Sequence, residues 1–152
     1  MAVDSFPIGD IWLDLMQKKV LPPLPAEDIS RILDRLEPGL QRLRDERMFI
    51  TGGTGFFGIW LLETIAHANR RLRTNIRVTV LARDPDAFII RCPHLVGKCE
   101  WLRGDVRDFA FPAGTYGHVI HAATSVDARF NASHPEVALD TMITGTHRVL
   151  AF

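Results

Sequence analysis

Apolar residues recur with two different periods along the chain. Near the start they are spaced at intervals of three and four, in residues 10–20 and again in 26–46, which predicts two amphipathic helices. Prolines within residues 21–25 separate these helices, because proline lacks a backbone N–H and restricts the residue before it. We therefore expect residues 1–47 to form a helical extension, with its second helix interrupted by the Pro-Gly pair at 38–39.

Beyond the extension, short apolar runs alternate with helical patterns. The runs are typical of buried strands, because they are brief, rich in β-branched residues or closed by glycine. Strands are predicted at residues 48–51, 75–82, 100–103 and 118–122, and helices at 57–72 and 134–152. Such alternation indicates an α/β fold with a parallel sheet and right-handed crossovers. We expect residues 48–152 to form a Rossmann-like sheet of about four strands with helices on both faces.

Composition restricts the classes of partner. The 18 Lys and Arg residues are balanced by 18 Asp and Glu residues, so the chain lacks the positive charge that general attraction to nucleic acid or anionic lipid requires. No apolar run approaches the ~20 residues that cross a bilayer. The N-terminus carries acids and prolines where a signal peptide would be basic and then apolar. We predict a cytoplasmic protein with no nucleic-acid or membrane partner.

The cysteines and histidines predict no metal site. Cys92 and Cys99 are the only cysteines, and we interpret them as reduced thiols because two cysteines make no disulfide framework. None of the six histidines joins them at a zinc spacing. A site made of both cysteines and His94 is the weaker alternative.

A glycine-rich segment separates the first predicted strand from the helix that follows it. Gly52 permits a sharp turn out of the strand, Gly55 allows a pyrophosphate to approach the backbone, and Gly58 lets the helix pack tightly on the strand. The free N–H groups and the dipole of the new helix would then face the phosphates. The predicted dinucleotide-binding residues of this turn are Gly52, Gly53, Thr54, Gly55, Phe56, Phe57 and Gly58.

Residues 51–58, which read TGGTGFFG, resemble the TGGxGFxG signature of the extended short-chain dehydrogenase/reductase superfamily. More narrowly, they resemble its NAD-dependent epimerase/dehydratase family, which works on nucleotide sugars. Further segments support the resemblance, namely GDVRD at 104–108, HAA at 121–123, and Pro135, Gly145-Thr146 and Val149-Leu150 in the last predicted helix. The resemblance covers about residues 47–152.

The resemblance implies a contact with the adenine end of the cofactor. Asp105 would accept a hydrogen bond from the adenine amino group, and Val106 would pack beside the ring. The alternative for Asp105 is that it caps the turn that follows it, as aspartate often does.

The resemblance also implies contacts at the nicotinamide end. Ala122 and Ala123 would lie under the ribose and the nicotinamide, where small side chains leave room for the cofactor. His121 belongs to the same matched segment, and Thr124 would face the nicotinamide or the substrate. The alternatives are plain core packing for the alanines and a loop hydroxyl for Thr124.

The residues after the second predicted strand bear on the choice between NAD and NADP. An acid there would bind the ribose hydroxyls and favour NAD, but the position holds Ala82. Arg83 follows, and its planar guanidinium suits a 2′-phosphate. NADP is therefore the expected cofactor. NAD is the alternative, with Arg83 on the adenine or in solvent, or with Asp84 as the acid if the strand ends later.

The Tyr-x-x-x-Lys pair on which the family's chemistry rests is absent. The single tyrosine is Tyr116, and residue 120 is isoleucine. We therefore expect a fragment that ends before this pair, contains no catalytic residue and is inactive alone. The full-length protein would be an oxidoreductase that epimerises, dehydrates or decarboxylates a nucleotide-linked sugar through a transient keto sugar.

Three other functions stay open. The enzyme could be an NADPH-dependent reductase of the same superfamily, acting on a thioester or a flavonoid-like ketone. The protein could instead be a non-catalytic module that senses NAD(P), or an assembly domain that works through residues 1–47. Those residues would cover the sheet, build a subunit interface or lie over the sugar-nucleotide site. We expect a homodimer, since an uncovered edge strand favours association.

Overall fold

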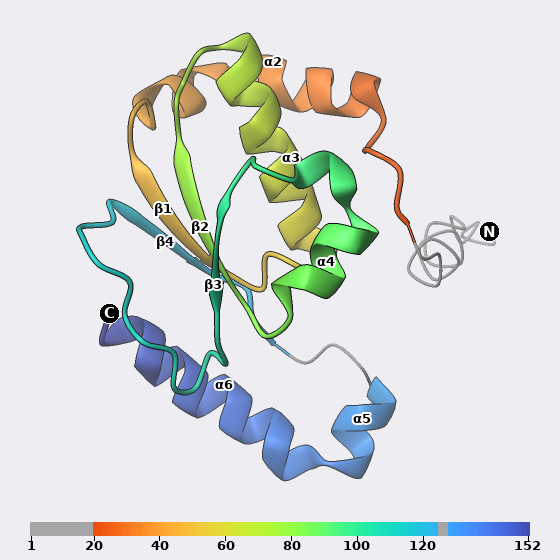
Figure 1. Ribbon diagram of the computed structural model, residues 1–152, viewed down its shortest axis with the longest axis vertical. Coiled ribbons are helices and arrows are strands. Elements are labelled where there is room, and N and C mark those ends of the chain that lie inside the picture. Colours follow the sequence, from red (N-terminus) through yellow and green to blue (C-terminus); the bar gives the residue numbers. More distant parts are fainter. Residues whose placement is uncertain (1–19, 125–127) are drawn as a thin grey trace, which may run out of the picture.

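The computed structural model describes residues 20–124 and 128–152. Its centre is a four-stranded sheet whose strands all run parallel, in the order β3-β2-β1-β4 (Figure 1). The strands are β1 (Arg47–Thr51), β2 (Arg77–Ala82), β3 (Glu100–Arg103) and β4 (His118–His121). Helices cover both faces of the sheet (Figure 1). The expected Rossmann-like α/β fold is confirmed.

β1 lies in the middle of the sheet. Ile50 pairs with Val80 of β2 on one side and with Ile120 of β4 on the other. Residues Met48 to Thr51 are buried, because both faces of the strand are covered. β2 and β4 flank β1 on opposite sides, so the winding of the chain reverses beside β1. In open parallel sheets, ligands bind at the carboxyl ends of the strands at such a reversal.

One face of the sheet carries four elements. They are α2 (Ala26–Arg42), α3 (Phe56–Arg71), α4 (Pro85–Arg91) and the short 3-10 helix η1 (Pro93–Leu95). α2 packs on α3 (Figure 1). Ile29 and Leu33 of α2 are buried in the same core cluster as Ile50 and Val80 of the sheet. The second helix of the predicted extension is therefore part of the main hydrophobic core.

The other face carries α6 (Pro135–Leu150), and α5 (Ala128–Ser133) packs against α6; both are drawn in blue in Figure 1. The core on this face is smaller and aromatic. Phe49 of β1 packs against Phe109 and Phe152, with ring centroids 5.3 and 4.8 Å apart respectively. These rings join the loop after β3 and the residues after α6 to the centre of the sheet.

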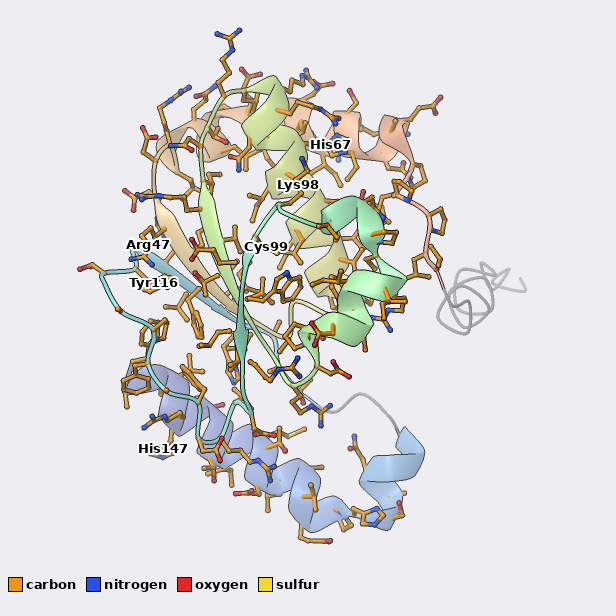
Figure 2. All side chains as sticks on the ribbon, viewed as in Figure 1. Arg47, His67, Lys98, Cys99, Tyr116 and His147 are labelled. Carbon is orange, nitrogen blue, oxygen red and sulfur yellow. The ribbon has the colours of Figure 1, made fainter. Side chains whose placement is uncertain are left out.

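The only tyrosine lies far from the carboxyl ends of the strands. Tyr116 and Arg47 lie side by side, on the loop before β4 and at the first residue of β1 (Figure 2). The Arg47 Nη2 group donates to the Tyr116 hydroxyl at 2.9 Å, and Thr79 lies 3.1 Å from the same hydroxyl. Tyr116 therefore holds together the amino ends of the strands.

The predicted interruption of the second helix at residues 38–39 is wrong, because α2 continues through Pro38 to Arg42. Pro38 lies on the exposed side of the helix. Water can therefore satisfy the carbonyl that loses its partner when proline lacks an N–H. The buried stripe continues past the proline at Leu40, which keeps the helix attached to the core.

One predicted helix is not tested, and three short helices among the described residues were not predicted. The helix predicted at residues 10–20 lies outside the described residues. The connector between β2 and β3 contains α4 and η1, and α5 precedes α6. These elements are too short to show a clear helical period, although Asp84 caps α4 and Pro85 occupies its first position. No helix in residues 20–124 and 128–152 is long and apolar enough to span a bilayer.

The packing of α2 makes a prediction about stability. Ile29 is 1% exposed, whereas Leu36 on the same helix is 50% exposed. We expect Ile29→Ala to lower the free energy of unfolding by about 2–5 kcal/mol, because it leaves a cavity in the core. The control Leu36→Ala should change it by less than about 0.5 kcal/mol. Denaturant unfolding measures both, and equal effects would contradict a structural role for α2.

Candidate functional site

The turn between β1 and α3 lies against the end of β4. Gly52 has a φ of +74°, which side chains rarely adopt. A Cβ on Gly52 would also lie 2.3 Å from the Ala122 carbonyl oxygen. Both the backbone conformation and the close approach therefore require glycine here. The expected sharp turn is present, and it brings residues 51–58 next to residues 121–124.

The remaining glycines of the turn differ in what surrounds them. A Cβ on Gly58 would lie 2.3 Å from the carbonyl carbon of Gly53, so the first turn of α3 closes on the glycine-rich turn itself rather than on the strand. A Cβ on Gly53 would lie 2.6 Å from Val80 Cγ1 on β2. A Cβ on Gly55 would meet only the Gly52 carbonyl oxygen, at 3.4 Å. Gly55 is therefore the least crowded glycine of this turn.

The start of α3 fits an anionic group. The N-cap residue, Gly55, supplies no side-chain cap, and the first turn of the helix contains no acid. Among the residues that the structure describes, no backbone carbonyl accepts from the N–H groups of Phe57 or Gly58. Unpaired N–H groups and a helix dipole both attract phosphate. The predicted pyrophosphate position is thus chemically suited to that group.

The last residues of β1 and of β4 share a hydrogen-bond network with Ala123. The Ala123 N–H donates to Thr51 Oγ1 at 3.3 Å, and Thr51 Oγ1 lies 2.6 Å from His121 Nδ1. His121 Nε2 lies 3.2 Å from Thr146 Oγ1 on α6. Thr51 Oγ1 can accept from the amide and still share a second hydrogen bond with His121 Nδ1, because a hydroxyl has one proton and two lone pairs; the imidazole tautomer sets which of the two groups donates. Burial also lowers the pKa of His121.

Ala122, Ala123 and Thr124 continue from the end of β4. The Ala122 N–H donates to the Thr51 carbonyl at 3.1 Å, so the pairing of β1 with β4 extends into the turn. Ala122 and Thr124 are exposed, while Ala123 packs against the aromatic core. The core-packing alternative applies to Ala123, and the room expected for the cofactor at Ala122 and Ala123 stays a prediction.

Asp105 follows β3 and is held by Arg107. Asp105 Oδ1 accepts from the Arg107 backbone N–H at 3.0 Å and from its Nε at 2.8 Å. These hydrogen bonds lower the pKa of Asp105. Arg107 also donates to Asp140 of α6 at 3.0 Å. The turn-capping alternative for Asp105 is thus part of the structure, and the contact with adenine stays a prediction.

Val106 is buried in the aromatic core. A Cβ on Gly145 of α6 would lie 2.8 Å from Val106 Cγ1, so the glycine lets α6 approach the loop after β3. Little of the Val106 side chain is left to pack beside an adenine ring. Any contact between Val106 and an adenine ring would therefore be made by the Val106 backbone and by the small exposed part of its side chain.

Arg83 stands at the carboxyl end of β2 with an exposed side chain. Its positive charge helps to lower the pKa of Asp105, which places the two groups near each other. Asp84 is engaged elsewhere, because its Oδ1 accepts from the Ala87 N–H at 3.1 Å and caps α4. Asp86 pairs with Arg103 at 2.5 Å. Neither acid is thus placed as a free ribose-binding carboxylate.

Arg91 was not singled out by the sequence, although it touches the glycine-rich turn. This last residue of α4 donates from Nη2 to the Thr54 carbonyl at 2.7 Å. No motif spacing connects a residue of the β2–β3 connector with the turn after β1. Only the packing of α4 beside the turn reveals the contact.

The alternative metal site of His94, Cys92 and Cys99 is not assembled in the part of the chain that the structure describes. His94 Nε2 lies 2.8 Å from Glu63 Oε1. Cys92 and Cys99 are free thiols, and burial raises the pKa of Cys99 to about 12. Within residues 20–124 and 128–152, no group of three or more His, Cys, Asp or Glu residues is arranged to hold a metal ion.

The fold and the turn together define a dinucleotide-binding domain of the Rossmann type. A family model gives the narrower class, since the model of the NAD dependent epimerase/dehydratase family matches residues 48–152. The chain belongs to this family. Membership implies a nicotinamide dinucleotide as the cofactor class, and it leaves the choice between NAD and NADP open.

Two further proteins are similar to the chain. Vestitone reductase from Medicago sativa is 29% identical over 93 residues, which are 59% of this chain and 28% of that protein. The crystal structure of the Aureusimine biosynthetic cluster reductase domain matches with a TM-score of 0.41 and 18% identity, over 84% of this chain and 39% of that one. The chain thus spans less than half the length of either protein.

The lowered pKa of His121 predicts a pH-dependent contribution to stability. The unfolded chain keeps the ordinary value of 6.5, so below it the unfolded state binds a proton that the folded state does not. The unfolding free energy of the wild type should therefore fall, relative to His121→Asn, as pH falls from 6.5 towards the folded pKa.

Denaturant titrations between about pH 5 and pH 8 measure this difference. Asparagine keeps an acceptor near Thr51 but does not titrate. Burial also lowers the pKa of His67, but His67 is present in both proteins, so its contribution cancels in the difference between their unfolding free energies. A difference that stays constant over this range would show that His121 is not held neutral.

Proposed function

We propose that the chain is the cofactor-binding part of an NADP(H)-dependent reductase. The observation that supports NADP(H) as the cofactor is the set of side chains after β2. Arg83 is exposed there, and its guanidinium makes no hydrogen bond to a described residue. Asp84 caps α4 and Asp86 pairs with Arg103. A free guanidinium without a free carboxylate suits a 2′-phosphate better than ribose hydroxyls.

The other site residues have complementary roles. The N-terminus of α3 would hold the pyrophosphate through backbone N–H groups at Phe57 and Gly58. Asp105 would meet the adenine, and the exposed edge at Ala122 and Thr124 would border the nicotinamide ribose. The nicotinamide, when bound, supplies hydride transfer, whereas this chain's residues bind and orient the dinucleotide.

The reductase is preferred because the relative from Medicago sativa is named a reductase. The second candidate is the epimerase or dehydratase reaction on a nucleotide sugar, which the family model favours. In both cases the substrate site and the Tyr-x-x-x-Lys pair would belong to the full-length protein.

Substitution of Arg83 tests the choice of cofactor. Arg83→Ala should weaken NADP+ binding by about 1–3 kcal/mol, the range of a charged hydrogen bond, and leave NAD+ binding unchanged. Calorimetry with both dinucleotides measures this. Arg31→Ala is the matched control, because Arg31 is exposed on α2 and pairs with Asp28 of the same helix. Equal losses for NADP+ and NAD+ would reject a 2′-phosphate contact.

Cofactor turnover separates the two reactions in the full-length protein. A reductase should oxidise one NADPH for each substrate molecule that it reduces. An epimerase or dehydratase should regenerate its cofactor and show no net change in absorbance at the nicotinamide band. A screen of carbonyl, thioester and nucleotide-sugar substrates, followed by product analysis, measures this. Sugar conversion without NADPH loss would favour the second candidate.

A further inference from the structure

Residues 21–25, which precede α2 in the N-terminal extension, form hydrogen bonds with the elements that flank the glycine-rich turn. The Leu21 N–H donates to the Arg91 carbonyl at 2.7 Å. The Leu24 N–H lies 3.0 and 3.1 Å from the two carboxylate oxygens of Glu63 on α3. Glu63 is 1% exposed and also binds His94 of η1. Residues 21–25 thus contact α3 and α4, and Glu63 joins α3 to η1.

Arg91 connects this segment to the turn. Arg91 is the last residue of α4, and the last carbonyls of a helix have no partner within the helix. The Leu21 N–H donates a hydrogen bond to the Arg91 carbonyl. The Arg91 guanidinium donates to the Thr54 carbonyl at 2.7 Å. η1 begins two residues later, and Glu63 holds it through His94. The Arg91 carbonyl is therefore held by Leu21, and the Arg91 guanidinium is held by the glycine-rich turn.

The contact with Thr54 fixes the peptide plane that ends the turn. The Gly55 N–H of that plane donates to the Gly52 carbonyl at 3.1 Å, and the Thr54 carbonyl on its other side accepts from Arg91. A trans peptide directs these two groups in opposite directions, so the two bonds together set its orientation. A carbonyl that rotated toward the phosphates would repel them. Arg91 keeps this carbonyl toward α4.

We infer that residues 21–25 act as a brace for dinucleotide binding, with Arg91 as a positioning residue that transmits their effect to the glycine-rich turn. This inference rests on the proposed dinucleotide site. It assigns to the extension a role in cofactor affinity. Because the brace acts on the turn and not on the 2′-phosphate, it supports NAD+ and NADP+ equally.

Leu21→Pro tests the brace, because it removes the N–H that binds the Arg91 carbonyl and keeps an apolar side chain. We expect the Kd of NADP+ and of NAD+ to rise by the same factor, about 2- to 10-fold, the range of one hydrogen bond. Leu21→Ala is the control, since it keeps the N–H and loses apolar contact. If Leu21→Ala weakened dinucleotide binding as much as Leu21→Pro does, the effect would come from apolar packing and not from the hydrogen bond, and the brace would be overturned.

Arg91→Met tests the transmission. We expect it to weaken both dinucleotides by about 10-fold, the lower range for a hydrogen bond from a charged group. In this background Leu21→Pro should have little further effect, since coupled residues are not additive. If Arg91→Met weakened the binding of NADP+ alone, Arg91 would be a ligand of the 2′-phosphate. If the losses from Leu21→Pro and Arg91→Met simply added in the double variant, the two residues would not be coupled. Either result overturns the inference.

Calorimetry on the folded variants supplies the affinities, and thermal unfolding shows that they are folded. Hydrogen exchange of the Thr54 and Gly55 amides adds a local measure, because both Leu21→Pro and Arg91→Met should speed it with exchange in the β1 core unchanged. If the wild-type chain binds neither dinucleotide, the proposed function fails. If it binds them and Leu21→Pro binds equally well, only the brace fails.

Discussion

The candidate site depends on the close approach of the glycine-rich turn to the end of β4. At Gly52 the backbone has a positive φ and leaves no room for a side chain in front of the Ala122 carbonyl. This contact brings Thr51, His121 and the Ala123 amide into one hydrogen-bonded network. It also sets the position from which α3 begins.

Much of the fold could be predicted from sequence, because the signals are local and repeated. The apolar runs at 48–51 and 100–103 are strands in the structure, and the glycine-rich turn lies where its spacing puts it. The continuity of α2 could not be predicted at Pro38, since the cost of a proline depends on whether water reaches the unpaired carbonyl. α4 and η1 were not predicted, because each is too short for a helical period of apolar residues to be recognised in the sequence.

The positions of the candidate residues in the fold could be predicted from the sequence, whereas the partners of their side chains could not. The position of Arg83 at the end of β2 follows from the strand pattern. The capping role of Asp84 and the two roles of Asp105 depend on neighbours that only the folded chain supplies. Arg91 has no sequence signal at all, because its partner Thr54 comes from a turn beyond another strand. Long-range contacts of this kind are properties of packing.

The pairing of β1 with both neighbours has a consequence for the order of assembly. Ile50 meets Val80 of β2 early in the chain, whereas its other neighbour, Ile120, comes from β4 much later. Contacts between residues far apart in sequence form slowly, since a long loop must close first. The strands β1 and β2 can therefore pair before β4 has been synthesised. The edge where the glycine-rich turn meets the end of β4 is thus among the last parts of the fold to form.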